Sequence, residues 1–382
     1  MNDPRYDGLA RLVLEHSLDL RAGQVLRIQG STAAAPLILA LHRAAIDRGA
    51  HAYTSVELEV FKELLIADGS DEQLDFVSPI ELRETDTIDA AVTIWAESNT
   101  RASTRLDAER HQRQIAAERQ YVMRRRDRVS RGELRWCGVL CPTNAHAQDA
   151  EMSLGDYEEF VFRACHVTDD DPVGHWRGIA SELQARAQEL DTVRELRILG
   201  EDTDLTVAVD GRRWRAAHGR QNMPDGEVYT SPVETGVSGA IRFGFPALFE
   251  GREIDDLRLR FEQGRVVAAE AARGASYLNA LLEMDAGAAT VGEVAFGLNY
   301  EIDRFTRNLL FDEKIGGTMH VALGMGFEDL GGTNRSSLHL DLICDLRRDG
   351  EVYADGELIW RAGRFVAEPQ PRPLTEPAPE RV

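Results

Sequence analysis

The arrangement of apolar runs along the chain changes near residue 190, and this change restricts the possible folds more than any other feature. Before it, short apolar runs alternate with helical stretches, which is typical of a parallel sheet flanked by helices. After it, β-like runs follow one another between turn signals, which indicates a largely antiparallel domain. A chain of 382 residues also exceeds what one hydrophobic core usually supports. We therefore expect an α/β N-terminal domain over residues 1–190 and an α+β, largely antiparallel domain over residues 191–366.

Individual elements can be assigned within this division. In the first domain we expect strands at Val25–Gly30, 52–58, Asp89–Trp95 and 134–140, and helices at Pro36–Arg48 and from Asp171-Pro172 to about Leu190. In the second, three turn signals indicate hairpins: Asp210-Gly211, Asp349-Gly350 and Asp355-Gly356. The final stretch, residues 367–382, is rich in proline and lacks apolar periodicity, so we expect a disordered tail.

The charge of the chain argues against two classes of partner. Acidic residues total 65 against 44 basic ones, a formal net charge of −21, and such a surface repels nucleic acid and anionic lipid. The one basic stretch, residues 101–131, has acidic residues interleaved with its arginines, as on a solvated helix. No stretch approaches the roughly 18 consecutive apolar residues of a membrane span, and the N-terminus lacks a signal-peptide pattern. We expect a cytoplasmic protein that binds neither nucleic acid nor membrane.

The four cysteines form no disulfide framework, which fits a reducing compartment. Cys137 and Cys141, together with the neighbouring pair Cys165-His166, could be read as a zinc knuckle. Pro142 and the apolar run WCGVLC around the first two cysteines favour a buried strand instead.

The strongest local signal for chemistry is His339-Leu340-Asp341, inside the strand-like run SSLHLDLICDL. Side chains two residues apart on a strand project to the same face, so His339 and Asp341 can reach one metal ion. A second run, GGTMHVALG, places His320 on the face opposite its apolar neighbours. A buried imidazole without a partner costs on the order of a few kcal/mol, so a metal ion or a carboxylate must satisfy it.

Two glutamates extend this set. Glu227 follows the turn residues Pro224-Asp225-Gly226, and Glu293 is the only charge within VGEVAFG. Taken singly, each could be an ordinary exposed or strand-edge acid. Together with the two histidines and Asp341 they are sufficient for two divalent ions that share a bridging water.

Four motifs in this order resemble the thermophilic aminopeptidases, the aminopeptidase T and aminopeptidase S type of metallopeptidase. They are NMPDGEVYTSPVE (222–234), VGEVAFGLN (291–299), LFDEKIGGTMHVALG (310–324) and GGTNRSSLHLD (331–341). The resemblance implies a homodimer whose second domain is catalytic and holds two divalent metal ions, zinc, cobalt or manganese, and acts on peptides. It places the metal ligands at the five residues reached above: Glu227, Glu293, His320, His339 and Asp341.

The resemblance also implies a mechanism, in which a metal-activated water attacks the scissile carbonyl and a carboxylate moves the proton. Glu293 is the candidate for base or bridging ligand, and the sequence does not separate these roles. One position departs from the family, which carries a tyrosine seven residues after the histidine of the GGT-x-H motif, where this chain has Phe327. Tyr300 and Arg335 are the candidate replacement donors and substrate-binding residues.

Two alternatives remain open at this stage. Two histidines and one aspartate also form the facial triad of non-haem iron oxygenases, and ring-cleaving dihydroxypyridine dioxygenases look like distant relatives of this peptidase family. Such a mononuclear site has no need of Glu227 and Glu293. Because of Phe327, a divergent member of the family without peptidase activity is the other alternative.

Overall fold

The computed structural model describes residues 3–249 and 251–367, and these form two compact units. One unit contains residues 3–176 and 219–224, and the other contains residues 177–218 and 225–367. The predicted domain boundary at residue 190 stays a prediction. The predicted disordered tail, residues 367–382, lies outside the described residues except for Ala367.

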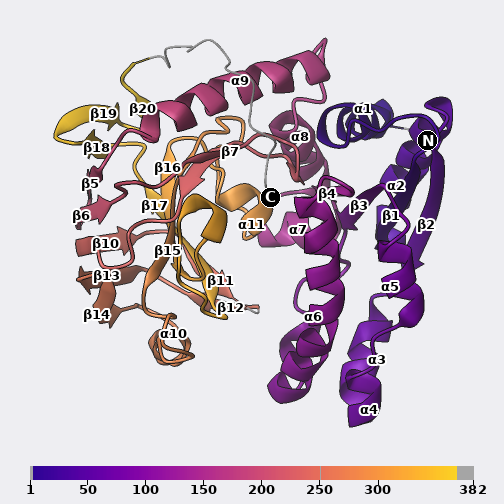
Figure 1. Cartoon of the computed structure of the whole chain (residues 1–382), viewed down its shortest axis with the longest axis horizontal. Helices are drawn as coiled ribbons and strands as arrows, with labels where there is room; N and C mark the ends of the chain where they lie inside the picture. The colour runs from indigo at the N-terminus through magenta and orange to yellow at the C-terminus, as the bar shows by residue number, and fades with distance from the viewer. Residues whose placement is uncertain (1–2, 250, 368–382) are drawn as a thin grey trace. The chain divides into compact units, whose positions relative to one another are not determined.

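The first unit is built on a parallel sheet in the order β2-β1-β3-β4-β8, of which β1 to β4 are labelled in Figure 1. Its strands are β1 (Val25–Ser31), β2 (His51–Glu57), β3 (Ala90–Trp95), β4 (Arg135–Leu140) and the short β8 (Asn222–Met223). All adjacent pairs run parallel. The helices are α1 (Pro4–Leu12), α2 (Ala35–Asp47), α3 (Val60–Asp68), α4 (Asp71–Leu74), α5 (Pro79–Thr85), α6 (Ala108–Ser130), α7 (Asn144–Asp149) and α8 (Leu154–Ala164). This confirms the predicted parallel sheet flanked by helices.

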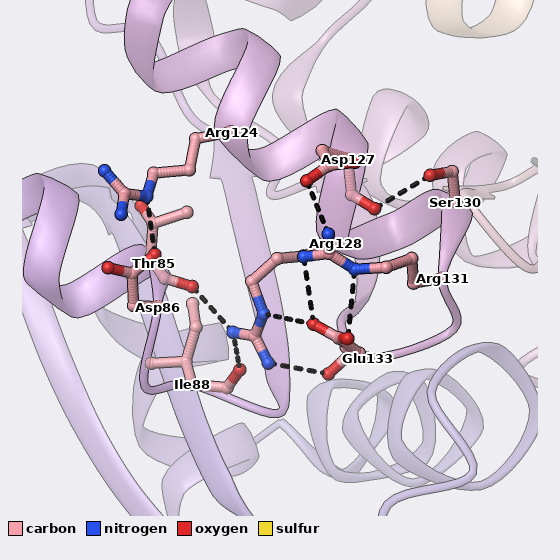
Figure 2. A network of polar contacts seen from close by, with 9 residues as sticks. All are labelled: Thr85, Asp86, Ile88, Arg124, Asp127, Arg128, Ser130, Arg131 and Glu133. Atoms are coloured by element: carbon pink, nitrogen blue, oxygen red, sulfur yellow. Dashed lines mark hydrogen bonds and ion pairs between the residues drawn. The ribbon is translucent and has the colours of Figure 1, made fainter.

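Most of the basic stretch forms α6, in which Arg110, Arg113, Arg124 and Arg128 pair with acids or carbonyls of the same unit. At its C-terminal end, Arg128 donates to the carbonyl oxygens of Thr85 and Ile88 at 2.6 and 2.7 Å (Figure 2). Arg124 pairs with Asp86 at 2.6 Å. These contacts give the arginines a structural role in joining α6 to the connection between α5 and β3.

The second unit contains two antiparallel sheets. Sheet B has the order β14-β13-β10-β6-β5-β18-β19-β20 and sheet C the order β17-β16-β15-β9-β7. Sheet B consists of β5 (Glu195–Gly200), β6 (Thr203–Ala208), β10 (Val237–Phe243), β13 (Leu257–Glu262), β14 (Arg265–Glu270), β18 (Glu351–Ala354), β19 (Glu357–Arg361) and β20 (Arg364–Phe365). Sheet C consists of β7 (Arg215–Ala217), β9 (Glu227–Thr230), β15 (Val291–Gly297), β16 (Thr318–Gly324) and β17 (His339–Asp345). The predicted antiparallel second domain is confirmed.

Smaller elements complete this unit: α9 (Pro172–Leu190), which begins in the first unit, α10 (Ala275–Leu282), α11 (Leu309–Asp312), and the two-stranded ribbon of β11 (Ala247–Phe249) and β12 (Arg252–Ile254).

Of the three predicted hairpin turns, only Asp355-Gly356 closes a hairpin, between β18 and β19. Both turn residues have positive φ, 49° and 86°, as a two-residue hairpin turn requires. Asp210-Gly211 and Asp349-Gly350 instead connect strands of different sheets, so the hairpin prediction was wrong there.

One face of sheet C packs into the main hydrophobic core of the second unit. Alternate residues of its strands, among them Val294, Phe296, Met319, Val321, Leu340 and Leu342, join side chains from sheet B, α9 and α10 in this core. Because side chains alternate along a strand, the residues between them project from the opposite face of sheet C.

The pairing of β15 with β16 contains a bulge that sets the direction of Glu293. Val291 pairs with Leu323, but Glu293 pairs with Ala322, so one extra residue, Gly292, lies on the β15 side. Without the bulge, the strict alternation of a strand would direct Val291 and Glu293 to the same face. With it, Val291 packs in the core and Glu293 projects from the other face.

We expect Gly292→Ala to disrupt this bulge. A Cβ at this position would lie 2.2 Å from the Met325 carbonyl oxygen and 2.4 Å from that of Gly324. Overpacking against backbone should lower the free energy of unfolding by about 1–3 kcal/mol, measured by denaturant titration. The control is Gly155→Ala in α8, where a Cβ meets no atom within 4 Å. Equal stability of the two variants would show that the bulge tolerates a side chain.

Candidate metal centre

The five expected ligands converge on the face of sheet C that points away from the main core. Glu227 begins β9, Glu293 lies on β15, His320 on β16, and His339 and Asp341 on β17. Their ligand atoms form two groups within 4.8 Å, Glu227-Glu293-His320 and Glu293-His339-Asp341. Glu293 belongs to both groups. All are buried except His339, which is partly exposed.

A small residue faces each of the five from one neighbouring strand and leaves space for this convergence, although His320 also pairs with Ile343 on its other side. Across the sheet, Glu227 pairs with Gly297 and His320 with Ala295. The other three pair in the same way: Glu293 and Asp341 with Ala322, and His339 with Gly324. Directly opposed side chains on one face lie about 4.5–5.5 Å apart at Cβ, so a larger neighbour would fill the space in which the polar groups meet.

Backbone carbonyls fix the orientation of both histidines. Nδ1 of His320 lies 3.0 Å from the Glu313 carbonyl oxygen, and Nδ1 of His339 lies 3.2 Å from that of Met325. A carbonyl oxygen can only accept, so each Nδ1 carries the proton and, in a neutral ring, Nε2 presents a lone pair. This is the usual arrangement of a metal-binding histidine, whose second nitrogen donates to a carbonyl or carboxylate.

Glu293 lies between the two imidazoles. Its Oε1 is 3.6 Å from Nε2 of His320, and its Oε2 is 3.3 Å from Nε2 of His339. Burial alone would raise its pKa, but hydrogen bonding to the two histidines outweighs burial and holds the pKa of Glu293 at about 2. The carboxylate is therefore ionised and has one oxygen directed to each histidine.

The pKa values of the surrounding groups are shifted because the site contains several buried acids and few positive charges. Burial raises the pKa of Glu227 well above its usual range, although nearby Lys314 opposes the change. Burial likewise raises the pKa of Asp341 to about 6, against the charge of His339. For His320 and His339 burial would lower the pKa, but Glu293 and the other acids outweigh it and raise the values to about 9 and about 10. Without added cations, acids and imidazoles therefore compete for protons.

Two buried carboxylate oxygens fit a site for cations. Among the described residues, Oε2 of Glu227 and Oδ1 of Asp341 find no hydrogen-bond partner, and their nearest histidine nitrogens are 3.6 and 3.5 Å away. Buried polar atoms are normally satisfied. A set of imidazole nitrogens and carboxylate oxygens suits zinc, cobalt or manganese, so the residues present are compatible with bound divalent ions.

Several residues of this region escaped the sequence reasoning. Glu313 forms a third ligand group with His320 and Asp341, and the next residue, Lys314, is fully buried with its Nζ 3.6 Å from Oε1 of Glu227. Lys314 also contacts the Glu313 carboxylate. The available signal was a pair of opposite charges inside the apolar run LFDEKIGG, in a chain that has only one other lysine, Lys62.

The three remaining predicted residues are placed differently. The Phe327 ring is in edge contact with His339, with centroids 5.9 Å apart. The Tyr300 hydroxyl donates to the Gly363 carbonyl at 3.0 Å, and Arg335 is exposed and pairs with Glu328. Tyr300 and Arg335 do not belong to the ligand groups. A residue not singled out, Tyr229, is in edge contact with Phe327 at a centroid distance of 5.1 Å.

In the described part of the chain, the cysteine motif does not form a metal site. All four cysteines are buried thiols, and none belongs to the ligand groups among the described residues. Cys137 lies within β4, as the strand interpretation predicted.

Comparison with known proteins identifies the family to which this chain belongs. The family model described as Thermophilic metalloprotease (M29) matches residues 2–365. The chain belongs to this family. M29 membership confirms the resemblance and the expected enzyme class: the protein is a metallopeptidase, and hence a metal-dependent hydrolase. It gives no support to the iron dioxygenase alternative.

Individual M29 relatives agree with this assignment. Aminopeptidase 2 of Geobacillus stearothermophilus is 27% identical over 406 residues, covering 95% of this chain and 98% of the relative. Aminopeptidase T of Thermus aquaticus is 31% identical over 246 residues, covering 54% and 58%. A solved structure, wild-type AmpT from Thermus thermophilus, superposes with a TM-score of 0.83 over 95% of this chain and 99% of that one. At 23% identity this likeness shows the fold.

We expect Lys314→Met to destabilise the metal-free protein. Lys314 is a fully buried cation 3.6 Å from Glu227, and removal of one partner from a buried ion pair costs about 3–5 kcal/mol. Chemical denaturation in the presence of a chelator measures the loss. The matched control is Lys62→Met on the surface, which should change the free energy of unfolding by less than about 0.5 kcal/mol. If both variants are equally stable, Lys314 does not compensate the buried acids.

Proposed function

We propose that this M29 protein is an aminopeptidase that removes N-terminal residues from peptides at a site with two divalent ions, zinc, cobalt or manganese. The observation that carries the proposal is Glu293, whose two oxygens face one histidine each and which is shared by both ligand groups. The names of the relatives, aminopeptidases of other organisms, support the same activity.

The proposed assignment follows the two groups. Glu227 and His320 would hold one ion, His339 and Asp341 the other, and Glu293 would bridge them. Ions bound there would lower the pKa of a coordinated water and polarise the scissile carbonyl. The place of Glu293 in both ligand groups favours it as the bridge. We assign the proton acceptor to Glu313, whose carboxylate belongs to the third ligand group and contacts Lys314.

Tyr229 is our candidate for the hydroxyl that Phe327 lacks. It lies two residues after Glu227 on β9, so both project from the same face of sheet C. Burial raises the pKa of the Tyr229 phenol, although the charge of Arg215, its cross-strand neighbour on β7, opposes this rise. The phenol therefore keeps its proton and can donate it to an acceptor. A substrate carbonyl at the site would be such an acceptor.

Other expectations remain predictions. The resemblance implies a homodimer, and the cysteine content indicates a cytoplasmic location; we keep both as proposals, and sedimentation velocity would check the first. Large apolar side chains are exposed on the first unit, including Phe61 at 62%, Phe76 at 69% and Ile80 at 78%, which is compatible with a covered surface.

Metal analysis of ligand variants tests the shared-carboxylate proposal. At the sheet C cluster we expect two ions per chain in the wild type, and loss of both of these ions and of peptidase activity in Glu293→Gln. Glu227→Gln should lose one ion, because Glu227 belongs to only one of the two groups containing Glu293. Glu328→Gln, at an exposed side chain, is the control. One iron per chain with oxygen-dependent activity would overturn the peptidase proposal, and equal losses in both ligand variants would remove Glu293 as the shared ligand.

The hydroxyl exchange between Tyr229 and Phe327 makes a second test. Tyr229→Phe should lower turnover of aminoacyl-arylamides by about 10–100-fold with unchanged metal content, because one donor to an oxyanion is worth up to roughly 3 kcal/mol. Adding Phe327→Tyr should restore part of the loss in kcat more than in KM. Tyr353→Phe, which removes a hydroxyl bonded to Glu351 on sheet B, serves as control. Full activity of Tyr229→Phe would exclude Tyr229 as the donor.

A further inference from the structure

A second group of potential metal ligands lies in the first unit, away from sheet C in the sequence. His166 follows α8, His175 lies in the first turns of α9, and Asp169 lies in the connection between these helices. One donor atom of each lies within 4.8 Å of the others. Neither the M29 match nor the proposed peptidase site gives these three residues a function.

Both imidazoles direct the same nitrogen at one carboxylate oxygen. Nδ1 of His166 is 3.2 Å, and Nδ1 of His175 is 3.1 Å, from Oδ2 of Asp169. The two rings stack with centroids 3.9 Å apart and planes inclined by 23°. Three donors of the kinds that bind transition metals therefore converge.

Helix ends hold these residues in place. The amides of His166 and Val167 donate to the carbonyls of Arg163 and Phe162, closing α8 with the two hydrogen bonds of a Schellman motif. His166 occupies the position with positive φ, 54°, where glycine is usual. Next to His175, the buried Trp176 indole donates to the Cys165 carbonyl at 2.9 Å. The site is thus built on two helix termini joined by a buried contact.

The two N···O distances are those of ordinary hydrogen bonds, which span about 2.7–3.2 Å. They are also close to the spacing of ligands around one metal ion. Ligands at 2.0–2.2 Å from a tetrahedral ion lie about 3.3–3.6 Å apart, so a bound ion requires the two stacked rings to separate and to turn their Nδ1 atoms toward it. The side chains of His175 and Asp169 are 41% and 36% exposed, so an ion can enter and water can complete its coordination.

We propose that His166, Asp169 and His175 bind one divalent transition-metal ion that links the end of α8 to the start of α9. Two imidazoles and one carboxylate favour zinc, nickel or copper over magnesium or calcium. With three protein ligands the ion keeps an open position, but the site lacks the buried carboxylates and the lysine of the sheet C cluster. Its role is structural, since an ion that binds only the folded state stabilises that state by an amount that increases with the ion concentration.

Zinc binding to the full-length protein tests this site. Equilibrium dialysis with zinc alone should show one ion fewer per chain in His175→Ala and in Asp169→Asn than in the wild type, with peptidase activity retained. His51→Ala, at an exposed histidine of β2, should bind as the wild type does. The difference of one ion is independent of how many ions the sheet C cluster holds, so failure of the peptidase proposal would not produce or hide it.

A thermal measurement gives a second readout. In Glu293→Gln, zinc should raise the Tm, and this rise should disappear when Asp169→Asn is added. Asp169→Asn preserves the side-chain shape and one acceptor oxygen, so a folding defect is not expected to obscure the result. Equal zinc content in the wild type, Asp169→Asn and His175→Ala would overturn the proposal and leave a purely hydrogen-bonded cluster.

Discussion

Compensation of buried negative charge is the constraint on which the second unit depends. Glu227, Glu293 and Asp341 are each at most 7% exposed on one face of sheet C, and moving a carboxylate out of water costs several kcal/mol even after relaxation. The protein supplies one permanent cation, Lys314, and two titratable ones, His320 and His339. Divalent ions would complete the compensation and free both imidazoles to act as neutral ligands.

The fold positions these charges through backbone rather than through further side chains. Both histidines are oriented by carbonyl oxygens, of Glu313 and Met325. The strands that carry these histidines pack against the main core through the alternating apolar residues of the other face. The geometry of the site therefore depends on the same packing that stabilises the unit. Substitutions in this core should affect the site through strand position, because packed interiors transmit strain.

Much of this arrangement follows from local patterns in the sequence. The alternation in SSLHLDLICDL places His339 and Asp341 on one face, and the structure has them there. Glu293 could not be assigned in this way, since its direction depends on the bulge at Gly292, which is visible only when β15 pairs with β16. The small partners Ala295, Ala322 and Gly297 acquire meaning only through register.

Tertiary contacts explain the remaining omissions. Lys314 reads as a surface lysine in sequence, but the acids that surround it make its burial possible. Turn signals such as Asp210-Gly211 indicate a reversal without saying which sheet receives the next strand. The contact of Tyr229 with Phe327 joins segments almost one hundred residues apart, which no local pattern reports.

The bulge at Gly292 has a consequence for how this chain can vary over evolutionary time. Successive side chains of a strand project to opposite faces of sheet C. The function of a residue on β15 therefore depends on whether its position in the alternation is odd or even, as well as on its residue type. Point substitutions preserve this alternation, whereas loss or gain of one residue between Val291 and Glu293 moves one of these two side chains to the opposite face of the sheet. Such a change would direct a carboxylate into the hydrocarbon core or a valine toward the ligands. Length changes of a single residue should thus be tolerated in the connections and excluded from this short segment.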